Sequence, residues 1–531
     1  MTSAAAAPWW HGTMGYEAYA RSFADGDGDG IGDLAGIAAH VGHLAWLGVD
    51  ALWITPFFRS PGFDHGYDVS DYTDVDPIHG TLDDFDTLVA AAHGVGIKVI
   101  VDVVPNHTSS LHPWFLAALS DPHGPYRDYY IWRDPAPGGG HPNNWVSHFG
   151  GPAWTLDPVS GQYYCHLFLP EQPDLNWRNP SVADEFDAIL RFWCDRGADG
   201  FRIDVAHALY KDEQFRDNPL IREPEQLTDP GEIFQSFEHR YDLDQDETVD
   251  VYRRWKRIVA PYQGILVGEV GTSDPVRISR YVADGALDTL FYLKPVWMTW
   301  QPLVLLDRLR AVHELNPERI SWVVDNHDSS RSVSRFGGGE VGAHRSMAVF
   351  TLMASLGGMP FLYQGQELGI GDGIIAPEHL ADPVATRNVG AAGRDGCRTV
   401  MPWNDGIANG FSTTSDCWLP AEDRPLEETV AGQIADPASW LHRYRALVAY
   451  RKATPALWTG EATWMDTPSG AVGALRRHGA VTIANLADET VTVELPPGLW
   501  SLGFASRALG ETEATGSIQV PAQTAVILEP A

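Results

Sequence analysis

The sequence predicts an α/β protein: a closed (β/α)₈ TIM barrel with a loop-rich insertion after its third strand and a C-terminal antiparallel β-sandwich domain. Two observations predict the barrel. Strand-like apolar runs alternate with helix-like segments along most of the chain, and several of these runs end in charged side chains. Because an isolated charge after a buried strand is unfavourable, the repeated pattern indicates parallel strands that converge on one polar pocket.

The strands and helices are expected in alternating order. The run at 98–104 (KVIVDVV) is apolar except for Lys98 and Asp102, which is typical of a parallel strand covered on both faces. Helical patterns occupy residues 82–93, 182–196 and 251–260. The expected strands are residues 51–57, 98–104, 200–204, 264–270, 287–291, 320–324 and 359–363.

Two segments interrupt this alternation. The chain between Asn106 and Trp177 is rich in Pro, Gly, His and Trp, and from about Ala456 it changes to short alternating strands with turns. We therefore expect the barrel in residues 1–106 and 178–455, an inserted subdomain in residues 107–177, and the β domain in residues 456–531.

Composition limits the classes of partner. The chain has 531 residues, 44% of them apolar, which is enough for a large core, and a net charge of −33. Such an acidic chain is not expected to bind nucleic acid or an anionic membrane surface, because both need basic patches. It suits a neutral or cationic small molecule, bound by a monomer or a homodimer.

No targeting signal or membrane segment is expected. The N-terminus lacks a basic start followed by a long apolar stretch, and there is no run of about 18 apolar residues. The four cysteines have no CxxC spacing, so we expect reduced thiols in a cytoplasmic protein, with a Cys397–Cys417 pair left open.

Four segments place charged residues at strand ends: DVVPNH from Asp102, GFRIDVAH from Gly200, VGEV from Val267 and VVDNHD from Val323. Glycoside cleavage needs a carboxylate nucleophile and a carboxylic acid that protonates the leaving oxygen.

The residues of these segments suit that chemistry. Arg202 lies two residues before Asp204, so both side chains point to one side of the strand, and the guanidinium is expected to keep Asp204 ionised as a nucleophile. Glu269 ends an apolar strand, where burial favours the neutral acid. Asp328, with His327, is expected to bind sugar hydroxyls and to stabilise positive charge at the reacting carbon.

In this order, and together with QPDLNW (172–177), HGYD (65–68) and YQGQELG (363–369), these segments resemble the signature regions of the α-amylase superfamily, glycoside hydrolase family 13. The form of QPDLNW is similar to that of the α-glucosidase and oligo-1,6-glucosidase branch. The resemblance covers the whole chain. It implies that Asp204 is the nucleophile, Glu269 the acid/base and Asp328 the transition-state stabiliser.

The resemblance also implies the remaining sugar contacts. His107, Arg202 and His327 match ligands of sugar hydroxyls around the cleaved bond. Tyr67 would stack on the non-reducing sugar, and Asp68 would accept hydrogen bonds from its outer hydroxyls. A site closed around a terminal glucose makes an exo-acting enzyme. Either Arg394 or Arg398 would complete that end, and His207 would lie on the acceptor side or at the surface.

The segment DGDGDGIGD (25–33) has oxygen ligands at alternate positions and resembles the first part of an EF-hand loop, which suits Ca²⁺. The glutamate at the twelfth position of an EF-hand is absent. The similar loop of the α-glucosidase branch implies a structural Ca²⁺, or Mg²⁺ in its place. An acidic turn without an ion is the alternative. The expected ligands are Asp25, Asp27, Asp29, Asp33 and the Ile31 carbonyl.

Three functions remain in order of preference. The first is hydrolysis of the terminal α-glucosidic bond of short, maltose-type oligosaccharides, with transglucosylation beside it. The second is an α-glucosyl transferase or isomerase such as a trehalose synthase, and the third is a non-catalytic sugar-binding protein. Linkage preference stays open, and Val205, which follows the nucleophile, is expected to shape the wall beside the acceptor sugar.

Overall fold

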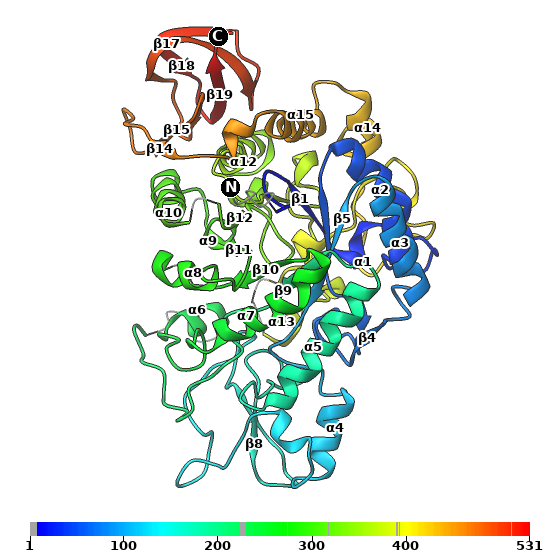
Figure 1. Cartoon of the computed structure of the whole chain (residues 1–531). Helices are drawn as coiled ribbons and strands as arrows, with labels where there is room; N and C mark the ends of the chain where they lie inside the picture. The colour runs from blue at the N-terminus through cyan, green and yellow to red at the C-terminus, as the bar shows by residue number, and fades with distance from the viewer. Residues whose placement is uncertain are drawn as a thin grey trace.

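The computed structural model describes residues 8–223, 230–272, 274–316, 318–388, 391, 393–510 and 512–531. It confirms the predicted barrel, in which eight parallel strands follow one another in chain order (Figure 1). The last strand pairs with the first, and the Met359 N–H donates to the Ile320 carbonyl at 3.1 Å, which joins the remaining edges. The strands are β1 (Gly15–Ala18), β2 (Ala51–Ile54), β5 (Lys98–Val103), β9 (Gly200–Ile203), β10 (Ile265–Val270), β11 (Thr289–Tyr292), β12 (Ile320–Trp322) and β13 (Phe361–Tyr363).

One helix after each strand covers the outside of the barrel. Local sequence signals start these helices: Asp33 accepts the Gly36 N–H at the start of α2, and Thr81 and Asp84 form a capping box at the start of α3. The eight helices are α2 (Leu34–Leu47), α3 (Leu82–Gly94), α5 (Pro180–Asp195), α7 (Thr248–Val259), α8 (Pro275–Tyr281), α10 (Pro302–Leu315), α12 (Gly339–Ala354) and α15 (Trp440–Ala453).

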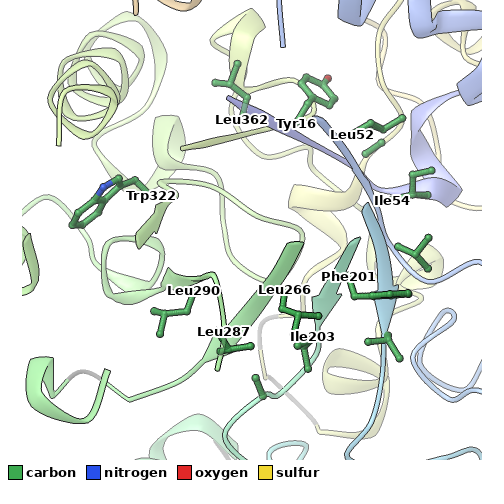
Figure 2. Packing of buried hydrophobic residues seen from close by; sticks show 14 of the residues in the cluster. Tyr16, Leu52, Ile54, Phe201, Ile203, Leu266, Leu287, Leu290, Trp322 and Leu362 are labelled. Atoms are coloured by element: carbon green, nitrogen blue, oxygen red, sulfur yellow. The ribbon is translucent and has the colours of Figure 1, made fainter. Parts of the chain in front are cut away.

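Alternation along each strand separates the core from the barrel interior. Leu52, Ile54, Phe201 and Ile203 belong to the main apolar cluster, which lies between the strands and the helices (Figure 2). The residues between them point the other way, so Arg202 faces inward.

The register of the parallel strands sets which inward residues are neighbours. Arg202 is paired with Asp102 on one side and with Val267 on the other. Glu269 lies two residues after Val267, and it therefore shares the inward face near the carboxyl end of β10. Glu17 of β1 is paired with Trp53 of β2 and also faces inward. A polar layer thus crosses the barrel near the carboxyl ends of its strands.

The segment between β5 and α5 forms a small layer of its own, with α4 (Pro113–Ser120) and a three-stranded sheet of β6 (Trp132–Arg133), β8 (Tyr163–Cys165) and β7 (Trp154–Leu156). It packs on the chain after β9, because Val205 and Ala208 share an apolar cluster with Trp145 and Leu167. A bridge between His107 and Asp174 ties its two ends together. It lies at the end of the molecule opposite the C-terminal sheet (Figure 1).

The C-terminal β-sandwich domain is one antiparallel sheet that bends over its own apolar cluster. Irregular pairing between Glu494 and Leu499 and between Leu502 and Phe504 lets the long strand β17 curve. The strands are β14 (Ala462–Trp464), β15 (Val472–Arg477), β16 (Ala480–Asn485), β17 (Val491–Ala505), β18 (Glu513–Val520) and β19 (Thr524–Pro530).

Two findings bear on the sequence expectations about thiols and membranes. All four cysteines lie in the described part of the chain and are free, so Cys397 and Cys417 are not paired. Among the described residues, no helix has both the length and the apolar character needed to cross a membrane.

Candidate active site

The guanidinium of Arg202 joins three carboxylates from adjacent strands. Its Nη1 donates to both oxygens of Asp102 at 3.0 Å and to Oδ1 of Asp204 at 2.7 Å. Its Nη2 donates to Oε2 of Glu269 at 2.6 Å. Arg202 is 1% exposed, so these bonds form out of contact with water and are strong. One cation therefore holds the predicted nucleophile and the predicted acid side by side.

One positive charge does not offset the three carboxylates around it. Burial, opposed by Arg202, raises the pKa of Asp102 to about 7. Burial, reinforced by the neighbouring Glu269 and Asp102, also raises the pKa of Asp204 well above its usual value, against the opposing effect of Arg202. Arg202 thus favours the ionised form of Asp204, as expected, but in the ligand-free site the guanidinium is shared and does not outweigh burial. That Asp204 is ionised when substrate is bound stays a prediction.

Asp328 lies in the opposite electrostatic environment. Its Oδ1 accepts from Nη1 of Arg394 at 3.1 Å and from Nη2 of Arg398 at 2.9 Å, and its Oδ2 lies 3.3 Å from Nε2 of His327. Burial opposes ionisation, but Arg394 and Arg398 outweigh it and lower the pKa of Asp328. Asp328 is thus a fixed anion, as stabilisation of a developing positive charge requires.

The two arginines left open by the sequence have different positions. The Arg398 side chain is fully buried behind Asp328, where its Nε donates to the His327 carbonyl at 2.7 Å. The Arg394 side chain is 16% exposed, and its Nη2 donates to Asp64 at 2.7 Å. Arg394 is therefore the arginine whose side chain is accessible within the site.

Asp64, rather than Asp68, occupies the place expected for an outer carboxylate. Asp68 is fully buried, and its oxygens accept from the Ser60 hydroxyl and from the N–H groups of Phe63 and Asp64 at 2.8–3.0 Å. The prediction that Asp68 binds sugar hydroxyls is therefore wrong, because its oxygens close the turn that carries Tyr67. Asp64 faces Arg394 instead. Asp64, which precedes HGYD, was not among the expected site residues, and only the shape of the turn distinguishes it from Asp68.

His107, Tyr67 and His327 line the same wall. The Tyr67 hydroxyl lies 2.7 Å from Nε2 of His327 and 3.2 Å from Asp102. Nε2 of His107 lies 3.1 Å from the amide nitrogen of Gln172, a residue of QPDLNW that we had not singled out. Both histidines are 0–1% exposed, and burial lowers the pKa of each, so they are neutral hydrogen-bonding groups.

The side chains of two candidates for the acceptor side contact the loops and not the polar cluster. Nδ1 of His207 accepts from the Gly271 N–H at 3.2 Å, which holds the loop after Glu269. Val205 has a φ of 42°, a strained conformation for a β-branched residue, and its N–H donates to Oε2 of Glu269 at 3.1 Å. The Val205 side chain is 7% exposed and packs toward the inserted segment. The backbone N–H of Val205, and not its side chain, contacts the predicted acid Glu269.

The acidic loop before α2 is wound around its own carboxylates. Ligand oxygens of Asp25, Asp27 and Asp29 lie within 4.8 Å of one another. Asp33 is not in that group: its oxygens accept from the N–H groups of Gly26, Asp27 and Gly36, which closes the loop. Three convergent carboxylates fit a hard cation such as Ca²⁺. Metal contacts by Asp33 and by the Ile31 carbonyl stay predictions.

Comparisons with known proteins agree with this geometry. Residues 17–460 match the family model described as "Alpha amylase, catalytic domain". The chain is 43% identical to the "Probable alpha-glucosidase" of Rhizobium meliloti (strain 1021), over 92% of this chain and 91% of that protein. It is 34% identical to the oligo-1,6-glucosidase of Heyndrickxia coagulans, over 96% and 97% of the two chains.

A solved structure is similar over almost the whole length. The α-glucosyl transfer enzyme XgtA superposes with a TM-score of 0.92 at 36% sequence identity, covering 99% of this chain and 100% of its own.

The reassignment of Asp68 leads to a prediction about pH. Burial outweighs the hydrogen bonds to Asp68 and raises its pKa to about 6. Because this value exceeds that of an unfolded aspartate, about 4, the stability that Asp68 contributes is fully present below pH ~4 and is lost as pH rises through ~6. In urea unfolding, the stability advantage of wild type over Asp68→Asn should shrink between pH 4 and pH 7. An advantage that grows with pH would contradict the assignment.

Proposed function

The chain belongs to the α-amylase family, and from this premise we propose that the protein is an exo-acting, retaining α-glucosidase of short maltose-type oligosaccharides. The observation that carries the proposal is the contact of one guanidinium, that of Arg202, with both Asp204 and Glu269 at 2.7 and 2.6 Å. Retaining glycosidases need two carboxyl groups about 5–5.5 Å apart, and a shared guanidinium supports that spacing.

The two carboxyl groups have different roles in the reaction. The Asp204 carboxylate attacks the anomeric carbon while Glu269 gives its proton to the departing glycosidic oxygen, so that a glucosyl ester forms and the first sugar leaves. Glu269, now ionised, removes a proton from water, and the water oxygen displaces Asp204. Arg202 neutralises the growing charge on Glu269 in the first step. The Val205 N–H holds the same oxygen in place.

The closed end of the site supports exo action. Arg394 joins Asp64 to Asp328, and Tyr67 lies against His327, its ring parallel within 9°. These groups offer donors and acceptors to the hydroxyls of one terminal sugar. The acceptor sugar then lies on the other side of the cleaved bond, beside Glu269.

Transfer of glucose to a sugar acceptor is the second candidate. It shares the Asp204 ester and differs only in whether water or a hydroxyl of another sugar takes the glucosyl group. The similarity to an α-glucosyl transfer enzyme over 99% of the chain supports transfer as the second candidate function. We propose hydrolysis as the main activity, with transfer at high sugar concentration, in a cytoplasmic protein whose four thiols are free.

The stereochemistry of the first product tests this mechanism. We expect α-glucose to be released first from p-nitrophenyl α-glucoside, because two successive inversions at the anomeric carbon retain its configuration and all the glucose comes from the transferred glucosyl group. Proton NMR recorded in the first minutes separates the two anomers before they equilibrate. Initial β-glucose would overturn the role of Asp204 as nucleophile. Tri- and tetrasaccharides in spectra recorded at high maltose would show transfer.

We also propose that the loop of Asp25, Asp27 and Asp29 holds a structural Ca²⁺, with Mg²⁺ as a weaker substitute. The support is the convergence of three carboxylates within 4.8 Å beside the start of α2. The carboxylates repel one another without a cation, so the ion would stabilise the turn between β1 and α2. Its position before α2 makes it a stabiliser of the fold and not a participant in the reaction.

Removal of the ion tests this site. After treatment with a chelator, added Ca²⁺ should raise Tm, since a ligand at a hundredfold excess over Kd stabilises the folded state by about 2.7 kcal/mol. Asp29→Ala should abolish the shift, whereas Asp405→Ala, a change at an exposed aspartate outside the loop, should keep it. An equal shift in both variants would place the ion elsewhere.

A further inference from the structure

A buried glutamate on the first barrel strand contacts the active-site histidine. Glu17 is 0% exposed and points into the barrel from β1. Its Oε1 lies 2.5 Å from Nδ1 of His327 and also accepts the His327 backbone N–H at 3.3 Å. Its Oε2 is buried and has no hydrogen-bond partner among the described residues. The hydrogen bonds that join Arg202 to Asp204 and Glu269 do not involve Glu17.

The ring of His327 has little freedom to turn. Tyr67 stacks on it at 5.4 Å between centroids with planes 9° apart, and Tyr19 stacks at 5.6 Å and 20°. The ring plane is thereby fixed, and the contacts at the ring edge decide which nitrogen carries hydrogen. At that edge Nδ1 meets Glu17, while Nε2 lies 2.7 Å from the Tyr67 hydroxyl and 3.3 Å from Oδ2 of Asp328.

We propose that Glu17 is a positioning residue that fixes His327 as the Nδ1–H tautomer and leaves its Nε2 as a hydrogen-bond acceptor. A backbone N–H is always a donor, so an oxygen that faces it must accept. Oε1 of Glu17 faces that N–H and Nδ1 together, and it therefore accepts from both. Nε2 then accepts from the Tyr67 hydroxyl, or from a sugar hydroxyl when substrate is bound.

The charge state of the pair is consistent with this assignment. Burial raises the pKa of Glu17 well above its usual value, and burial lowers the pKa of His327, so burial favours the neutral form of both groups. With Oε1 accepting two hydrogen bonds, the carboxyl proton belongs on Oε2. A glutamine has the same shape and one accepting oxygen, so it can replace Glu17 in this role, whereas an apolar side chain cannot.

The tautomer of His327 decides which hydrogen bonds Asp328 can accept from the substrate. An Nε2–H group would donate to Asp328 and occupy one of its oxygens. With a bare Nε2, Oδ2 of Asp328 is left for a sugar hydroxyl, and the same sugar can donate a second hydroxyl to His327. The inference rests on the proposed glucosidase function only for its kinetic test.

The tautomer can be measured directly. The full-length protein is labelled with ¹⁵N-histidine, and His327, one of 20 histidines, is assigned by its loss in His327→Gln. Long-range ¹H–¹⁵N correlations distinguish a protonated from a bare ring nitrogen. We expect Nδ1 protonated and Nε2 bare in wild type and in Glu17→Gln, and a changed pattern in Glu17→Met. The opposite tautomer in wild type would overturn the proposal.

Kinetics supply the second test. Glu17→Met should lower kcat/KM for maltose by about 10–100-fold, the effect of one or two buried hydrogen bonds, while Glu17→Gln should stay within about threefold of wild type. The matched control is Glu367→Met, at a glutamate that is also 0% exposed but accepts from the Tyr16 hydroxyl outside the polar layer. It should keep its activity per folded molecule and the His327 spectrum.

The outcomes separate the two proposals. Equal loss of activity in Glu17→Gln and Glu17→Met, or equal loss in Glu367→Met, would show that Glu17 acts only through packing. Absence of glucosidase activity in wild type would contradict the proposed function, yet the tautomer of His327 would still be decided by the spectrum. If Glu17→Met does not fold, wild type and Glu17→Gln alone decide the assignment.

Discussion

The contacts of the Arg202 guanidinium are the interaction on which the rest of the site depends. Arg202, Asp102 and Asp204 are buried and Glu269 is half-buried at the carboxyl ends of three adjacent strands, where isolated charges would oppose folding. They are tolerated because the register of β5, β9 and β10 brings Asp102 and Glu269 to opposite sides of one planar, five-donor cation. The same hydrogen bonds that stabilise these charges also hold the two reacting carboxyl groups in place.

The site is divided into two electrostatic halves. Around Arg202, carboxylates outnumber the cation, and the pKa values of Asp102 and Asp204 rise. Around Asp328, two arginines donate to the same carboxylate oxygen, and the pKa of Asp328 falls. One half can therefore hold and move a proton while the other offers a permanent negative charge. Opposed environments of this kind let carboxyl groups with similar chemistry take different roles.

Much of this arrangement could be predicted from the sequence. The strand-end motifs identified the polar layer, and the two-residue spacing of Arg202 and Asp204 placed both on one face. The strand at β1 was missed because GYEA is only four residues long and contains Glu17. The role of Glu17 could not be predicted from its neighbours in the sequence, since its partner His327 lies 310 positions away along the chain.

Backbone conformation explains the remaining errors. Asp64 and Asp68 look equivalent in sequence, but His65 and Gly66 have positive φ values of 51° and 109°, and the resulting turn sends one carboxylate to Arg394 and the other inward. The positive φ of Val205 likewise has no signal in its residue type, which disfavours that conformation. The shared guanidinium was also unforeseen, because strand register, and not spacing within one strand, assigns Arg202 three partners.

The central claim is that Arg202 acts through its planar fork and not through its charge alone. The most direct measurement is kcat/KM for maltose in Arg202→Lys and Arg202→Met, with circular dichroism to confirm that both are folded. A lysine keeps the charge but cannot donate in two fixed directions to Asp204 and Glu269. We predict that Arg202→Lys loses about 100-fold or more and falls close to Arg202→Met. A lysine variant within a few-fold of wild type would contradict the account.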